Sequence, residues 1–338
     1  MSCARRVVGD ERTPFLSDSV SSIRHRGRKR SFCPTGDMQE SLLSNIFVPV
    51  PSDAAQSTGA YTIASVWEGE SFSEDVLSSF GLCVKDTFRE LCKTVDYIQK
   101  SCPERTPFVD CSSVEIAQSS TQACEFLSFF RRRSLNVLYE KALFTLEGGE
   151  KRRPCNEGVC EDPVDGMRQW FSENGHKVRE IRLSSSSLYC IPSEMMALSN
   201  VERIHVLYSR IPKLPHSVSF PVVRLLNLVG NGLEVFPEDI NLPLLEDLFL
   251  GQNKIRGFSQ SLGTLSQMRM LDVRSNPLSS LPCSLQKCSR LCQVILFDTS
   301  IATYDGPLLF FRSLKRACIE RKLRDSICLP PNGPSLVF

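Results

Sequence analysis

Apolar residues recur in the second half of the chain with a period longer than that of a single helix or strand. The pattern is clearest around Asn231, which has apolar residues eight, five and three positions before it and two and five positions after it. The arrangement occurs six times, and its first residues are 22 or 23 positions apart: Val178, Val201, Val223, Leu245, Met268 and Leu291. A fixed period of this length predicts a solenoid, in which each repeat packs on its neighbours.

Each repeat is expected to contain one short strand. Residues five and three positions before the reference residue should point into the core and those between them outward, because side chains alternate along a strand. The reference residues are short and polar, and we expect them to bond backbone groups of adjacent repeats. This structural ladder comprises Ser186, Ser209, Asn231, Asn253, Asn276 and Thr299.

In four of the six repeats a proline follows the last apolar residue, at Pro192, Pro215, Pro237 and Pro282. With this ending the repeats resemble the leucine-rich-repeat family in its common form of about 23 residues. The resemblance covers residues 178–305. It implies an α/β fold, a solenoid whose parallel sheet forms a six-repeat horseshoe, with helical caps and an N-terminal helical segment.

The outward side chains of the predicted strands form a candidate binding face. Leu207, Leu225, Val229, Phe249, Met270, Ile295 and Phe297 would leave an apolar band in water with charged groups around it, and such patches are typical of interaction sites. An alternative is that the N-terminal helices fold back and fill the concavity. The predicted partner-binding residues are Arg203, His205, Leu207, Asn227, Val229, Asp247, Phe249, Met270, Asp272, Arg274, Ile295 and Phe297.

Residues 66–147 are predicted to be helical. Ser71 and Glu74 have capping-box spacing, and the apolar residues that follow at intervals of three or four predict one amphipathic helix ending near Lys100. A second helix is expected over about residues 121–146. The three arginines at 131–133 are interpreted as a solvated turn that interrupts this second helix.

The remaining segments flank the repeats. Glycine, charge and proline predict a linker at residues 148–161. Asp162 and Pro163 start the predicted N-terminal helical cap, residues 162–177. Residues 306–338 are predicted to be a C-terminal helical cap and tail, because apolar residues from Leu308 to Ile319 fit one helix face.

Residues 1–65 are rich in serine and proline and predict a disordered leader. Its basic tract, residues 24–30, fits a nuclear import signal or a contact with an acidic surface, although a solvated tract is the favoured interpretation. The chain shows neither a secretory-signal pattern nor a membrane-span pattern, and its 15 cysteines are scattered. We therefore expect a soluble cytoplasmic protein whose cysteines are mostly reduced.

Motifs for cofactor chemistry are missing from the sequence. Neither the phosphate-loop pattern nor the dinucleotide-binding glycine pattern occurs. Of the clustered Cys283, Cys288 and Cys292, the middle one replaces a core leucine in the repeat register, which argues against a metal cluster. Cys155 and Cys160 in the linker leave a redox or metal site open. We expect no cofactor, no metal and no catalytic residue.

Three functions remain open. The favoured hypothesis is a non-enzymatic scaffold or adaptor that binds another protein on the concave face of the repeats. The second is a virulence effector secreted by a bacterial type III apparatus, with residues 1–40 as the secretion leader and the repeats engaging a host protein. Some bacterial effectors resemble this order of helices followed by leucine-rich repeats. The third is an enzyme with its active site in residues 71–146. A formal net charge of +2 argues against a dedicated nucleic-acid binder, and the oligomeric state stays open.

Overall fold

The computed structural model describes residues 62–63, 74–102, 116–146, 163–184, 188–301, 314–319 and 335–337. All of these residues belong to one unit of the chain, residues 49–338. The predicted leader, apart from residues 62–63, lies outside the described residues. So do the predicted linker at 148–161 and the first ladder residue, Ser186.

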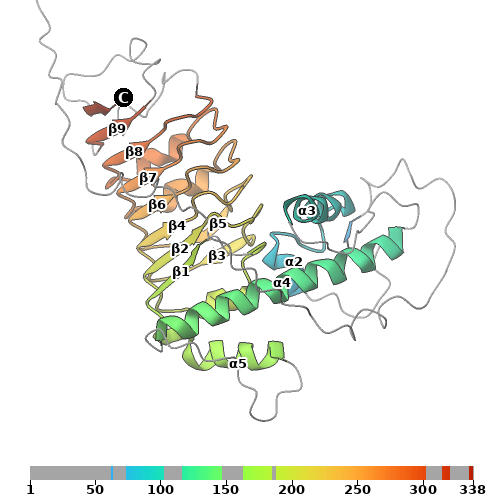
Figure 1. Ribbon diagram of the computed structural model, residues 1–338. Helices are drawn as coiled ribbons and strands as arrows, with labels where there is room; N and C mark the ends of the chain where they lie inside the picture. Colours follow the sequence, from blue (N-terminus) through green and yellow to red (C-terminus); the bar gives the residue numbers. More distant parts are fainter. Residues whose placement is uncertain are drawn as a thin grey trace, which may run out of the picture. The chain divides into compact units, whose positions relative to one another are not determined.

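Parallel strands form the main sheet of the repeats (Figure 1). The strand order is β1-β2-β4-β6-β7-β8-β9-β10, so neighbouring strands in the sheet follow one another through the repeats. Their bounds are β1 Glu180–Ser184, β2 Arg203–Leu207, β4 Leu225–Asn227, β6 Asp247–Phe249, β7 Met270–Asp272, β8 Gln293–Ile295, β9 Arg316–Cys318 and β10 Ser335–Val337. This topology confirms the predicted α/β solenoid.

The strand register reproduces the sequence period. Ile204 pairs with Leu226, and Leu226 pairs with Leu248, so equivalent core residues stack directly on one another. These side chains and the apolar residue two positions further along are buried in one core. A second, two-stranded parallel sheet joins β3 (Ser217–Ser219) to β5 (Asp239–Asn241).

Short 3-10 helices follow the apolar residue that ends a repeat. They are η3 (Ser193–Ala197), η4 (Gln260–Thr264) and η5 (Cys283–Lys287). Pro192 and Pro282 directly precede η3 and η5, where the fixed φ of proline suits the start of a helix. At Ser259, which stands in the proline position of repeat four, the hydroxyl accepts a hydrogen bond from the Ser261 amide and caps η4 instead.

A residue in the left-handed backbone conformation directly precedes five of the ladder positions. The backbone φ angles are 50° at Tyr208, 75° at Gly230, 57° at Gln252, 52° at Ser275 and 54° at Asp298. Only one of these residues is a glycine, the type that adopts positive φ without strain. At Gly230 the side chain of Tyr208 occupies the space of a Cβ atom, which would lie 2.4 Å from the tyrosine ring. Four residues other than glycine adopt this conformation in the other repeats, so the close contact with the Tyr208 ring is what favours glycine at this position.

Two helices cover the first strand. The helix α5 (Pro163–Asn174), followed by η2 (Gly175–Lys177), lies where the sequence predicts the N-terminal cap. The second half of α4 (Ile116–Leu146) also joins the repeat core, because Leu135, Leu138 and Ala142 pack in the same cluster as Ile181. The C-terminal half of α4 is therefore part of the repeat core.

The predicted single helix before Lys100 is in fact two helices. The helix α2 (Glu74–Ser79) ends at a turn, and α3 (Phe88–Ser101) follows it. Gly81 lies in this turn with φ 64°, a left-handed conformation that breaks the helix. The two helices and the first half of α4 enclose a second apolar cluster, which also takes in Tyr189 of the first repeat.

The interpretation of residues 131–133 as a solvated turn is wrong. Helix α4 runs without interruption through all three arginines, and Arg131 is only 4% exposed. None of the helices in the described parts of the chain combines the length and the apolar character that crossing a membrane requires.

The prediction of a C-terminal helix is also wrong for residues 314–319, the part of it that the structure describes. Residues 316–318 form strand β9, which pairs in parallel with β8, and β10 pairs in parallel with β9. Leu314, Ala317 and Ile319 are buried in the repeat core and stand 23 positions after Leu291, Val294 and Leu296. The repeat period therefore continues into a seventh strand.

Candidate functional site

Side chains on the outward face of the sheet align in three rows, here called the outward rows. Strand register defines the first row as Glu180, Arg203, Leu225, Asp247, Met270 and Gln293. The second row is Arg182, His205, Asn227, Phe249, Asp272 and Ile295. The third row follows two positions later and is Ser184, Leu207, Val229, Gly251, Arg274 and Phe297.

The predicted partner-binding residues differ in exposure. Arg203 is exposed, whereas Val229, Asp272 and Ile295 are buried at 7%, 1% and 6% exposure. The other eight are half-buried: His205, Leu207, Asn227, Asp247, Phe249, Met270, Arg274 and Phe297. The expectation of a continuous apolar band in water is therefore wrong, because Val229 and Ile295 are covered.

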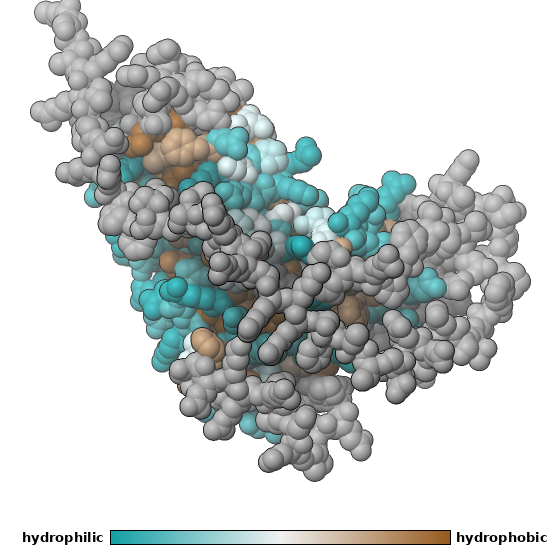
Figure 2. Space-filling model, in the orientation of Figure 1, coloured by the Kyte–Doolittle hydropathy of each residue, from teal (hydrophilic) through white to brown (hydrophobic). Residues whose placement is uncertain are grey.

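The observed surface is a mixture. Side chains on strands about 4.8 Å apart cover much of each other's area, which explains why long residues in the rows are half-buried and not fully exposed. On the face shown in Figure 2, hydrophilic residues dominate the described surface, and hydrophobic residues show between them. Within the outward rows, the half-buried Phe249 lies between the polar residues Asn227 and Asp272, so apolar contact area is interspersed with polar groups.

A cluster of charged groups lies at the first two strands. Glu180 accepts hydrogen bonds from Arg182 and from Arg203 Nε, the latter at 2.9 Å. Burial raises the pKa of Glu180, but these bonds outweigh it and the pKa lies below the ordinary value. His205 Nε2 lies 3.9 Å from Glu180 Oε1. Burial and then the charge of Arg182 lower the pKa of His205, which favours its neutral form. The arginines therefore provide the positive charge here.

The middle of the rows is less polar and more buried. Phe249 lies between Asn227 and Asp272 in the second row. Burial raises the pKa of Asp272 and that of Asp247, so this environment disfavours both negative charges. Arg274 Nε lies 3.3 Å from Asp272 Oδ2, but it makes no hydrogen bond to any described residue.

Two polar side chains in the second row are fixed by the backbone. Asn227 Oδ1 accepts a hydrogen bond from the Val229 amide at 3.2 Å. Asp272 Oδ1 accepts the equivalent bond from the Arg274 amide at 3.1 Å. Side chains held in this way lose little rotamer freedom when a partner binds, which lowers the entropic cost of association.

The five described ladder residues lie inside the solenoid, away from the outward rows. Asn253 is representative: its Nδ2 donates to the carbonyls of Leu228 and Leu250, both at 2.9 Å, and its Oδ1 accepts from the amides of Asn231 and Leu233 at 3.1 and 3.0 Å. Asn231 and Asn276 make similar bonds to the preceding repeat. Ser209 and Thr299 are also buried. Because one amide both donates and accepts, each asparagine links two repeats.

Sequence reasoning missed a buried charge network at the junction between the N-terminal helices and the first repeat, here called the junction network. Arg131 Nη2 lies 2.9 and 3.0 Å from the two oxygens of Glu194, and Arg131 Nε donates to Ser79 Oγ at 3.1 Å. Arg168 Nε donates to Glu194 Oε1 at 2.9 Å and Arg168 Nη2 to Asp75 Oδ2 at 3.2 Å. No sequence motif joins these four elements, so only the fold reveals the network.

Of the cysteines singled out in the sequence, the three described ones differ in their surroundings. Cys288 is buried in the repeat core, and its burial raises the thiol pKa to about 11. Cys283 is exposed and Cys292 is half-buried. Cys155 and Cys160 lie outside the described residues.

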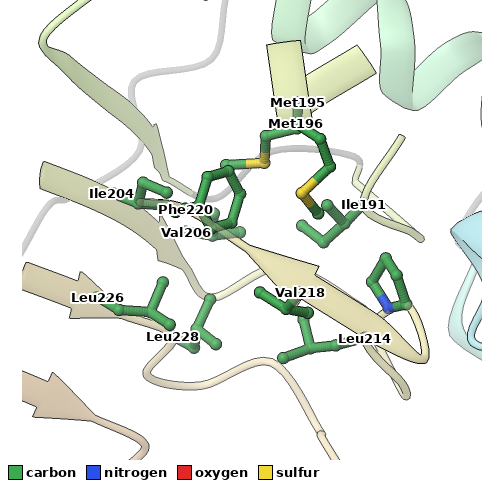
Figure 3. Close-up of a pocket in the computed structure, with 11 residues that line it drawn as sticks. Ile191, Met195, Met196, Ile204, Val206, Leu214, Val218, Phe220, Leu226 and Leu228 are labelled. Atoms are coloured by element: carbon green, nitrogen blue, oxygen red, sulfur yellow. The ribbon is translucent and has the colours of Figure 1, made fainter. Parts of the chain in front are cut away.

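A small apolar cavity lies within the repeats, behind the sheet (Figure 3). Its volume is about 20 Å³, and its walls include Met195 and Met196 of η3, Val218 of β3 and Phe220. It has no polar lining atoms. A space of this size and character neither holds a small-molecule ligand nor satisfies a water. The cavity is therefore a packing feature.

Comparison with known proteins gives structural likeness only. No protein-family model and no curated protein sequence matches the chain. Among solved structures, an internalin from Listeria monocytogenes has 16% identity and a TM-score of 0.43, covering 55% of this chain and 53% of the internalin. A leucine-rich-repeat protein from Leptospira interrogans has 19% identity and a TM-score of 0.33, covering 50% of this chain and 52% of that protein.

The chain thus spans about half the length of each of these two proteins. The assignment of the fold rests on the chain's own features, which are the period of 22 or 23 residues, the parallel strand order and the buried asparagine ladder. These features give the repeats the fold of a leucine-rich-repeat solenoid.

Proposed function

We propose that the chain is a non-enzymatic scaffold that binds a partner protein through the outward rows. The observation that carries the proposal is the alignment of these rows across six consecutive strands, with half-buried apolar groups beside fixed polar and charged groups. Repeat solenoids build extended binding surfaces in this way, since every repeat adds one set of side chains in register.

The composition of the rows supports a protein partner. Phe249, Met270 and Arg203 belong to residue types that are enriched in protein interfaces, and the rows present them within one continuous face. Phe249 is an aromatic anchor candidate because it lies near the centre of the rows and is half-buried before any partner binds. The arginines near Glu180 supply a charged rim at one end.

Helix α3 contacts the repeats away from the outward rows. Glu90 of α3 bonds Lys213, and the Lys254 ammonium lies 5.2 Å from the ring centroid of Tyr97. In the part of the chain that the structure describes, α2 and α3 pack against α4 (Figure 1), and the turn between them lies against Leu214, shortly before β3. This placement favours partner binding over the alternative in which the N-terminal helices fill the sheet face.

A comparative capture experiment tests the proposal. The full chain and two variants are immobilised, and the proteins retained from a cell extract are quantified by mass spectrometry. The first variant combines Phe249→Arg with Arg203→Glu, at two positions of the outward rows. The matched control is Val235→Glu, which changes an apolar residue with 56% exposure outside the rows.

We expect at least one protein to bind the wild type and the control equally and to fall by roughly tenfold or more on the row variant, since central interface anchors carry about 2 kcal/mol or more. Circular-dichroism melts must show that all three chains are folded. Equal retention by the row variant and the wild type would refute the proposed binding face.

A further inference from the structure

Three potential metal ligands meet where the turn between α2 and α3 touches the second repeat. Cys83 and Asp86 lie in the turn, and His216 directly follows Pro215. The Cys83 sulfur, a carboxylate oxygen of Asp86 and a ring nitrogen of His216 all lie within 4.8 Å of one another. The sequence predicts no metal site here, because the histidine is far from the other two residues along the chain.

The turn itself fixes two of these residues. The Asp86 amide donates to the Cys83 carbonyl at 3.0 Å, and the Cys83 amide donates to Asp86 Oδ2 at 2.8 Å. These two bonds close the turn and hold the carboxylate beside the cysteine. Thiol and carboxylate are therefore brought together by the backbone without the need for a ligand.

Close backbone packing brings the histidine to the turn. A Cβ atom on Gly81 would lie 2.4 Å from the Leu214 carbonyl oxygen, so the turn touches the chain just before His216. Lys213 Nζ also donates to Glu90 Oε2 of α3 at 3.1 Å. The approach of His216 to Asp86, with Nε2 to Oδ2 at 3.6 Å, thus follows from contacts that do not involve the three ligands.

We propose that Cys83, Asp86 and His216 bind a divalent transition-metal ion, and Zn²⁺ fits this set of donors best. Zinc takes thiolate sulfur at about 2.3 Å and imidazole nitrogen or carboxylate oxygen at about 2.0–2.2 Å. Ligand atoms of a tetrahedral site then lie roughly 3–4 Å apart, so small side-chain rotations within the present cluster are sufficient. Thiolate and imidazole exclude Mg²⁺ and Ca²⁺ as preferred ions.

The charges of the donors also match a divalent ion. A thiolate and a carboxylate supply two negative charges, and a neutral imidazole supplies the third ligand. Three protein ligands leave the fourth position of the ion for water or for a donor from another molecule. Because Cys83 must lose its proton on binding, metal affinity falls as the pH is lowered.

An ordinary ion pair between Asp86 and His216 is the main competing explanation, and it does not need Cys83. A thiol-imidazole-carboxylate relay is a second alternative, but it places the imidazole between the other two groups. Asp86 Oδ2 instead bonds the Cys83 amide and approaches His216. The carboxylate thus lies beside both residues, as a shared ion requires.

Cobalt titration of the metal-free full chain tests the proposal, since tetrahedral Co²⁺ is a coloured substitute for Zn²⁺. We expect one equivalent of Co²⁺ to produce a thiolate-to-cobalt charge-transfer band and strong visible bands, which added Zn²⁺ removes. Cys83→Ser should abolish that band. Both Cys83→Ser and His216→Gln should weaken Co²⁺ binding by roughly tenfold or more. Cys283→Ser removes an exposed cysteine of the repeats and is the matched control.

The titration also has outcomes that overturn the proposal. The wild type could give no charge-transfer band, or Cys83→Ser could leave the band unchanged, in which case another cysteine binds the metal. Wild-type affinity in His216→Gln would exclude the histidine; because this residue is exposed, we expect the variant to fold. Zinc should also raise the melting temperature of the wild type but not of Cys83→Ser, because the ion would link the turn to the second repeat.

Discussion

The middle repeats and the junction with the N-terminal helices both bury polar groups, but they satisfy them with different chemistry. In the middle repeats, Asn231, Asn253 and Asn276 bond backbone groups of the preceding repeat with neutral amides. At the junction, Arg131 and Arg168 share the carboxylate of Glu194. The asparagines of the middle repeats recur at a fixed period. The charged residues of the junction come from elements that are far apart in the sequence.

This difference determines how each region responds to a change. Removing one partner of a buried ion pair leaves an uncompensated charge and costs about 3–5 kcal/mol. Removing a neutral hydrogen-bonding side chain costs about 1–3 kcal/mol for each group left unsatisfied. The junction is therefore expected to be the more sensitive region, both to substitution and to pH.

The largest effect is expected for Arg131→Met. The change leaves Glu194, which is 8% exposed, with Arg168 as its remaining cationic partner. We expect the free energy of unfolding to fall by about 4 kcal/mol, measured by urea denaturation followed by circular dichroism. Arg132→Met is the matched control, because Arg132 is the next residue of α4 and is exposed.

Two further measurements separate charge from shape at this position. The double variant Arg131→Met with Glu194→Met should recover most of the loss, since no buried charge remains. Burial raises the pKa of Glu194, but the charge of Arg131 and the hydrogen bonds from Arg168, the backbone and Arg131 together outweigh it, so the folded-state pKa lies below the ordinary value. This contribution is complete above the unfolded-state pKa and is lost as the pH falls through the folded-state pKa. Equal losses for Arg131→Met and Arg132→Met would contradict this account of the junction.

The second-largest effect is expected for Asn253→Ala. The substitution leaves the Asn231 and Leu233 amides and the Leu228 carbonyl without this partner, and we expect a loss of about 3 kcal/mol in unfolding free energy. Thr299→Ala should cost clearly less, because the Thr299 hydroxyl bonds the Leu296 carbonyl within its own repeat. If Thr299→Ala lowered the unfolding free energy as much as Asn253→Ala, hydrogen bonds between repeats would not explain the stabilising effect of Asn253.

Both the success and the failures of sequence-based prediction follow from this contrast. The role of Asn253 was predictable because a short polar residue recurs at the same position of each repeat. Arg131 was not, because its partner Glu194 lies 63 positions away and a run of three arginines is usually solvated. Strand β9 was missed for another reason: Leu314 and Ile319 also fit a helix face, and that local pattern obscured their 23-residue distance from Leu291 and Leu296. Of the candidate site, the rows were predictable, but the burial of Val229 and Ile295 was not.

A smaller change, which increases the free energy of unfolding, is expected for Asp272→Asn. This substitution removes a buried charge from the middle repeats. Asn227 shows that an amide makes the same bond to the backbone. Burial raises the pKa of Asp272, so the folded protein disfavours its charge at neutral pH. We expect a small gain in unfolding free energy near pH 7 that vanishes in acid, where the aspartate is protonated. Destabilisation at pH 7 would mean that the charge pair with Arg274 dominates.

The smallest effect is expected for Val218→Ile, at the apolar cavity between η3 and the second and third repeats. One added methyl group fills space of about 20 Å³ and should stabilise the fold by about 0.5 kcal/mol, since burial of a methylene contributes about 0.8 kcal/mol before strain is subtracted. Val235→Ile, at an exposed position, should change the melting temperature little. A lower melting temperature for Val218→Ile would indicate overpacking.

The most direct test of the central claim, that the outward rows bind a partner protein, is photo-crosslinking. A benzophenone amino acid replaces either Phe249, near the centre of the rows, or Val235, which is exposed outside them. Each chain is irradiated with the captured partner, and the adducts are identified by mass spectrometry. The account predicts an adduct from the Phe249 position and none from the Val235 position. An adduct from Val235 with none from Phe249 would contradict it.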